Sequence, residues 1–124
     1  MRTPFGQYPE YHTSADNLDF ISMAALSDSF EKCAMALDII DDNRVYSNQN
    51  PKCEPQLGKR GLYQSLGGKT QTQVNEMAIL WVLNLSDGTH SLLDIAEKSG
   101  YSFESIKTAA TLLAEHQLLK DLPA

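Results

Sequence analysis

The residues of this chain that are best placed for chemistry lie near its start, where Tyr11 and His12 are adjacent. Hydrogen-bonding side chains follow them at Thr13, Ser14 and Asp16. A neutral imidazole on a short loop can bind a metal ion, and a neighbouring phenol can donate a hydrogen bond to developing negative charge. A single histidine in such a loop is more often a hydrogen-bonded surface or core residue. Both interpretations remain open on these residues alone.

Two runs of sequence resemble one bacterial family. The first is FGQYPEYHTSADNLDF at residues 5–20, and the second covers residues 50–52 and 54–63. Both are similar to an aminopeptidase-like family within the two-zinc aminopeptidases, whose members are often labelled polysaccharide biosynthesis proteins with an aminopeptidase-like domain. The tail, residues 74–124, resembles the winged-helix-like domain at the C-terminus of those proteins. The resemblance covers essentially the whole chain and implies that it is the C-terminal part of a longer protein.

The resemblance also implies roles for particular residues. It places His12 among the zinc ligands and aligns Tyr11 with a position that helps stabilise the oxyanion of a tetrahedral intermediate in some relatives. Asp16 is interpreted as a local cap or as a group that supports the ligands. The other ligands and the general base would precede Met1. The expected zinc therefore belongs to the intact parent, which would act on a peptide-like or amino-acyl small substrate, and this chain alone would be inactive.

The elements that must position these residues begin with residues 1–9, which the prolines at Thr3-Pro4 and Tyr8-Pro9 predict to be extended. A long helix is predicted next, capped by Ser22 and running to about Asp42. Its apolar positions recur at steps of three and four: Met23, Leu26, Phe30, Cys33, Leu37 and Ile40. This stripe needs a partner surface, either the sheet of its own enzyme or another protein.

A polar loop occupies residues 47–61, after a short extended piece at 44–46. Lys59 and Arg60 between two glycines could hold an anion, although a basic pair in a loop is more often simply solvated. Cys53 is interpreted as a thiol without a chemical role, because no histidine is close to it in sequence. The small, polar residues 65–73 predict a linker between domains.

Beyond the linker, three helices are predicted over residues 77–85, 92–99 and 103 to about 116. Their expected apolar sides are Met77, Leu80, Trp81 and Leu85, then Leu92, Leu93, Ile95 and Ala96, and finally Ile106, Ala109, Ala110, Leu112 and Leu113. Ser91 and Ser102 are the expected caps, and Gly100 is the expected turn. This spacing is typical of a helix-turn-helix, and Leu118-Leu119 could begin a strand.

Charge bears on whether this unit reads DNA. Residues 74–124 carry seven carboxylates against three lysines, a net charge of −4. The third helix offers Lys107 as its only basic residue, beside Glu104 and Glu115. DNA readers take most of their affinity from lysine and arginine on phosphates. Nucleic acid is therefore disfavoured as a partner, and a protein partner or self-association is favoured instead. His90 and His116 are interpreted as surface or packing residues.

Composition supports a cytoplasmic protein. The net charge of the chain is −6, and no apolar run approaches the length of a membrane span. Cys33 and Cys53 lack the spacing of a metal or disulfide framework, which favours reduced thiols.

The sequence as a whole predicts a mostly α fold in two parts. Residues 1–64 form the C-terminal segment of an α/β zinc-peptidase-like domain, and residues 74–124 form a winged-helix-like helix-turn-helix domain after the linker. The predicted function is that of one portion of a zinc-dependent aminopeptidase-like hydrolase, contributing one metal ligand and a helical accessory domain. The alternative is a small helix-turn-helix regulatory or protein-interaction module. Zinc binding at His12 would favour the first, and salt-dependent binding of duplex DNA would favour the second.

Overall fold

The computed structural model describes residues 3–62 and 76–123. The chain divides into two compact units, Met1–Asp41 and Asp42–Ala124. About half of the described residues are helical, and three short strands form one sheet. No helix within the described ranges combines the length and the apolarity that a bilayer crossing requires.

The first unit begins with turns rather than with the predicted extended segment. Residues 3–21 are turns and bends, and their backbone bonds join residues three apart, beginning with Gln7 N to Pro4 O at 3.1 Å. Gly6 has a φ of 79°, which lets the chain reverse directly after the proline. The expectation of extended structure was therefore wrong for the described residues 3–9, because this glycine converts a proline-biased segment into a turn.

Helix α1, Met23–Asp42, begins where the sequence predicts it. Ser22 Oγ accepts a hydrogen bond from Ala25 N at 3.1 Å, as an N-cap does. No residue of α1 is buried, and its apolar stripe is open to solvent, with Met23 77%, Phe30 75% and Ile40 68% exposed. The stripe therefore has no packing surface among the described residues of its own unit.

The second unit contains a three-stranded antiparallel sheet in the order β2-β1-β3. Its strands are β1, Val45–Asn48, β2, Asp87–Ser91, and β3, Leu119–Leu122. Val45 pairs with Ser91 on one side and with Leu122 on the other. The central strand thus precedes all three helices of the unit in sequence. The predictions of extended structure near 44–46 and of a strand beginning at 118–119 are confirmed.

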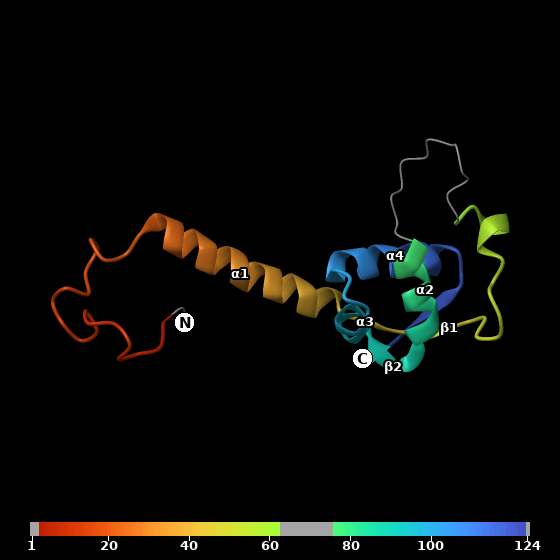
Figure 1. Ribbon diagram of the computed structural model, residues 1–124, viewed down its shortest axis with the longest axis horizontal. Helices are drawn as coiled ribbons and strands as arrows, with labels where there is room; N and C mark the ends of the chain where they lie inside the picture. Colours follow the sequence, from red (N-terminus) through yellow and green to blue (C-terminus); the bar gives the residue numbers. More distant parts are fainter. Residues whose placement is uncertain (1–2, 63–75, 124) are drawn as a thin grey trace. The chain divides into compact units, whose positions relative to one another are not determined.

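Helices α2, Glu76–Leu85, α3, Leu92–Ser99, and α4, Phe103–Glu115, enclose one hydrophobic core. Figure 1 shows these three helices grouped together, with β1 and β2 beside them. Fully buried side chains at the centre of the core are Leu57, Ile79, Val82, Ile95, Ile106 and Leu113. The helix boundaries agree with the predicted ones to within a residue or so.

One predicted apolar face was wrong. Helix α2 buries Ala78, Ile79, Val82 and Leu83, whereas Met77 is 50% exposed. Because α2 is apolar on nearly every side, periodicity does not determine which side faces the core.

A smaller error concerns α3, whose Leu93 was expected to point inward but is 45% exposed. Its neighbours Leu92, Ile95 and Ala96 are buried as predicted.

Residues 49–62, which follow β1, contribute to the core of the second unit. A short 3₁₀ helix, Leu57–Arg60, follows β1, and Leu57 and Leu62 belong to the same core as the three helices. The division that the structure shows lies after Asp41, well before the predicted linker at 65–73. That linker lies outside the described residues.

The cap of α3 allows a quantitative prediction. Ser91 Oγ accepts from Asp94 N at 3.2 Å, and Asp94 Oδ2 accepts from Ser91 N at 2.8 Å, which together form a capping box. Replacing Ser91 with alanine should lower the free energy of unfolding by about 0.5–2 kcal/mol at neutral pH. Urea denaturation measures this loss, and Glu97→Ala on the exposed side of α3 is the matched control.

The effect of Ser91→Ala should also depend on pH. Hydrogen bonds from the Ser91 side chain and backbone hold the pKa of Asp94 below its usual range. A carboxyl group with a lowered folded-state pKa stabilises the fold above its unfolded pKa, and this stabilisation is lost as the pH falls through the folded value. The difference between wild type and Ser91→Ala should therefore shrink in acid, and an equal difference at neutral and acidic pH would contradict this account.

Candidate functional site

The predicted site residues Tyr11 and His12 lie in consecutive turns of the first unit. Tyr11 N donates to Tyr8 O at 3.3 Å, and Thr13 N donates to Glu10 O at 3.0 Å. Between these turns His12 adopts a left-handed backbone with a φ of 59°. The ring centroids of Tyr11 and His12 are 4.1 Å apart with the planes tilted by 47°. The structure therefore brings the phenol ring and the imidazole into contact.

An aromatic cluster supports Tyr11 from the other side. The Phe5 ring stacks on Tyr11 with centroids 5.3 Å apart, and the edge of Tyr8 meets Tyr11 at 5.6 Å. Phe20, which precedes α1, stacks on Tyr8 at 5.6 Å. Such ring pairs contribute about 0.5–1.5 kcal/mol each beyond the area they bury. This cluster was not predicted, although the aromatic residues at positions 5, 8, 11 and 20 are the sequence feature that could have indicated it.

Negative charge lies close to this aromatic cluster. Partial desolvation of the hydroxyl, followed by the negative charge of Asp16, raises the pKa of Tyr8. No helix begins at Asp16, whose backbone N–H instead donates to Thr13 O at 3.2 Å. The cap of α1 belongs to Ser22, so Asp16 is not the helix cap that was one interpretation of it.

Whether these residues suit a zinc ion depends on the number of donors. Catalytic zinc is held by three protein ligands plus water. The His12 side chain is exposed and offers one imidazole, but no three His, Cys, Asp or Glu side chains come together within residues 3–62 and 76–123. The described residues therefore do not form a zinc site by themselves.

His90, which the sequence predicts to be a surface or packing residue, contacts two charged side chains. His90 Nδ1 lies 3.0 Å from Asp87 Oδ2, and its Nε2 lies 2.6 Å from Lys98 Nζ. Hydrogen bonds from the Thr89 N–H and hydroxyl, and then from His90, hold the pKa of Asp87 far below its usual range. These contacts lie within β2 and between β2 and α3.

His116 ends α4, where its backbone N–H caps the last turn. Both cysteines, Cys33 and Cys53, are free and exposed.

Helix α4, which would be the recognition helix of a DNA-binding helix-turn-helix, presents few positive charges. The exposed positions of α4 are Glu104, Thr108, Thr111 and Glu115. The only lysine of α4, Lys107, places its Nζ 2.6 Å from Asp42 Oδ2. A DNA-reading helix presents cations to phosphates, and here the helical cation is already paired with a carboxylate.

Two family descriptions match the chain. A winged helix-turn-helix family matches residues 44–121, and a domain of unknown function, DUF4910, matches residues 1–43. The junction between the two matches falls close to the division of the structure after Asp41.

A curated relative and a solved structure are similar to nearly the whole chain. The relative, from Clostridium acetobutylicum, is 51% identical over 120 residues, which are 97% of this chain and 27% of the relative. Its provisional name is polysaccharide biosynthesis protein with aminopeptidase-like domain. The structure, a crystal structure of a protein provisionally titled a peptidase from the same organism, is 48% identical with a TM-score of 0.79. The aligned residues are 93% of this chain and 24% of the crystallised chain. This chain therefore spans about a quarter of the length of the crystallised protein and of the curated relative.

Proposed function

The chain belongs to the winged helix-turn-helix family over residues 44–121, and we propose that it is one portion of a zinc-dependent aminopeptidase-like hydrolase. The observation that carries this proposal is the 51% identity, over 120 residues, to a protein named for its aminopeptidase-like domain. The substrate class we propose is a peptide-like or amino-acyl small molecule, and the compartment is the cytoplasm, in keeping with the two free thiols.

In this proposal the first unit is the part that belongs to the hydrolase domain. His12 supplies one metal ligand, and Tyr11, whose ring lies against the imidazole, supplies a hydrogen bond to the reacting oxyanion. The left-handed backbone at His12 supports this ligand role. That conformation is energetically unfavourable for a non-glycine residue, and such residues cluster at functional sites. The exposed stripe of α1 then packs on the rest of the hydrolase domain. The chain alone would be inactive, since the described residues supply one ligand.

The winged-helix unit acts as an accessory domain in this proposal. Its paired lysine and the carboxylates on α4 favour contact with protein rather than with DNA. Salt-dependent binding of duplex DNA by the complete gene product would contradict this role.

The test is the zinc content and aminopeptidase activity of the complete gene product beside its His12→Ala variant. We expect the variant to lose bound zinc and turnover together, because imidazole removal deletes a direct ligand. His116→Ala, which removes an imidazole far along the sequence, is the matched control and should keep both. Tyr11→Phe should keep zinc but lower kcat by about 10²–10³, the usual effect of deleting an oxyanion donor. A wild-type protein without zinc, or a His12→Ala variant with full zinc and activity, would overturn the proposal.

A further inference from the structure

A polar pocket of about 360 Å³ lies in the second unit, in the segment that follows β1. It is lined by Asn50, Glu54, Pro55, Gln56, Lys59 and Arg60. This volume is at the lower end of the range of small-molecule sites.

The pocket is built on a fixed piece of backbone. Pro55, Leu57 and Leu62 are buried, and Leu57 lies at the centre of the core. Glu54 Oε1 accepts from Leu57 N at 3.1 Å, and Arg60 Nε donates to Pro55 O at 3.0 Å. Arg60 also reaches across to the His116 carbonyl at 3.4 Å. These bonds join both ends of the pocket segment to each other and to the end of α4.

The backbone of the pocket segment contains two non-glycine residues in the left-handed conformation. Gln56 precedes the 3₁₀ helix with a φ of 56°, and Cys53 has a φ of 63°. A left-handed non-glycine residue costs roughly 1–3 kcal/mol and persists where the surroundings enforce it, often at ligand sites. Two such residues, Cys53 and Gln56, lie within four positions of this segment, and Gln56 lines the pocket.

The charges in the pocket are not balanced. The hydrogen bonds of Arg60 to Pro55 and His116 go to carbonyl oxygens. No carboxylate of the described residues lies within ion-pair distance of Lys59 or Arg60. The pocket thus carries two cations against the single carboxylate of Glu54, in a protein whose net charge is −6. Cations that the protein leaves without a carboxylate provide a site for a ligand anion.

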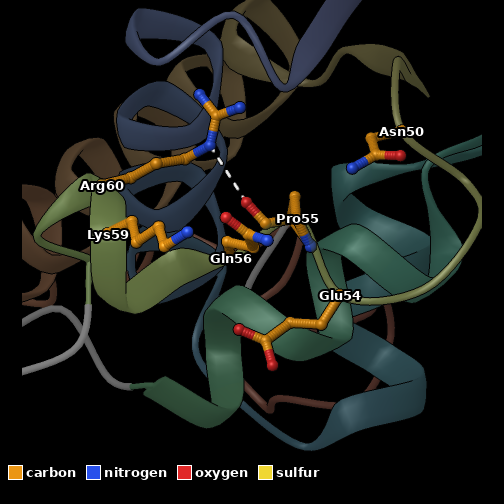
Figure 2. Close-up of a pocket in the computed structure, with 6 residues that line it drawn as sticks. All are labelled: Asn50, Glu54, Pro55, Gln56, Lys59 and Arg60. Carbon is orange, nitrogen blue, oxygen red and sulfur yellow. Dashed lines mark hydrogen bonds between the residues drawn. The ribbon is translucent and has the colours of Figure 1, made fainter.

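The remaining groups narrow the ligand class. In Figure 2 the Lys59 side chain points toward Gln56, and the Glu54 carboxylate lies apart from the two cationic side chains. The Glu54 carboxylate would repel a dianion such as phosphate, but it can accept a hydrogen bond from an ammonium group. A ligand that carries one carboxylate and one ammonium group can pair its carboxylate with the two cations and its ammonium group with Glu54.

We propose that this pocket binds an amino acid or a short peptide, with the ligand carboxylate at Lys59 and Arg60 and the ligand ammonium at Glu54. The inference does not depend on the proposed role of His12. Because most of the lining side chains are exposed, the affinity should be modest and the ligand should exchange readily.

The test uses the full 124-residue chain and NMR titration, with the amide signals of Gln56, Leu57 and Gly61 as reporters. The probes are alanyl-alanine, its C-terminal amide, its N-acetyl derivative and inorganic phosphate, each at millimolar concentration. Alanyl-alanine should shift these signals, whereas the amide and the N-acetyl form should bind several-fold more weakly. Equal binding of alanyl-alanine and its amide, or no shift in the pocket, would overturn the proposal.

Two variants and one control test the residues. Lys59→Gln should weaken alanyl-alanine binding by about 5- to 10-fold, a typical loss for one partly exposed charged contact. Lys52→Gln is the control, because it removes an exposed lysine from the same loop that does not line the pocket. Glu54→Gln keeps the oxygen that accepts from Leu57 and should weaken the dipeptide while strengthening phosphate. Phosphate binding that exceeds dipeptide binding in the wild type would show a simple anion site instead and refute the assignment.

Discussion

Replacing Leu57 with alanine is expected to lower the free energy of unfolding of the second unit by about 2–5 kcal/mol, the usual cost of a large-to-small change in a core. Leu57 is 0% exposed and belongs to the same core cluster as Ile106 of α4, although it lies in a polar, glycine-rich segment. The loss has two parts, the transfer free energy of the deleted methyl groups and the cavity that the surrounding helices cannot fully close.

Urea denaturation of the full chain, followed by circular dichroism, measures this effect. Ile106→Ala, at a site that is also 0% exposed, should cost a comparable amount. Leu93→Ala is the matched control, because the same side chain is removed from a site that is 45% exposed, and it should cost about 1 kcal/mol or less. If Leu57→Ala destabilised no more than Leu93→Ala, the segment after β1 would not be part of the core.

The helix ends were predictable because their signals are local. Ser22 and Ser102 bond to backbone N–H groups three residues on, and Gly100 ends α3 with a φ of 73°. Such caps depend on the identity of one residue and its immediate neighbours.

Strand β2 was not predicted, because its sequence Asp-Gly-Thr-His-Ser has neither alternation nor apolar residues. It is a strand because β1, about forty residues earlier, pairs with it. Pairing of this kind is a property of the assembled sheet, and no local pattern encodes it.

The shape of the loop that carries the candidate site residues could not be predicted from the sequence. The choice of Tyr11 and His12 rests on the resemblance alone, and the contact between their rings was not predicted. The left-handed backbone of His12 and the stacking of Phe20 on Tyr8 arise from the sequence of turns between residues 3 and 21. The zinc ligand role of His12 remains a prediction that the metal analysis will test.

A chain that begins at residue 74 is expected to lack a cooperative unfolding transition, whereas one that begins at residue 42 should have it. In the structure β2 and β3 each pair with β1 and not with each other. Removing β1 therefore leaves two short strands without any ladder partner, and it also removes the Asn48 amide that donates to Leu83 O at 2.8 Å. The loss of Leu57 and Leu62 would in addition remove two buried side chains from the core that α2, α3 and α4 share.

Amide dispersion in NMR spectra and urea denaturation of the two truncated chains distinguish these outcomes. Residues 42–124 should give dispersed signals and one sharp transition, since they contain every strand and every core residue of the second unit. A cooperative transition of residues 74–124 at the same urea midpoint would place the true boundary at the predicted linker. Residues 45–62 would then be an appendage of the winged helix. Loss of the transition would instead make β1 and Leu57 integral to that fold, and the boundary between the two folding units would lie between the two family matches.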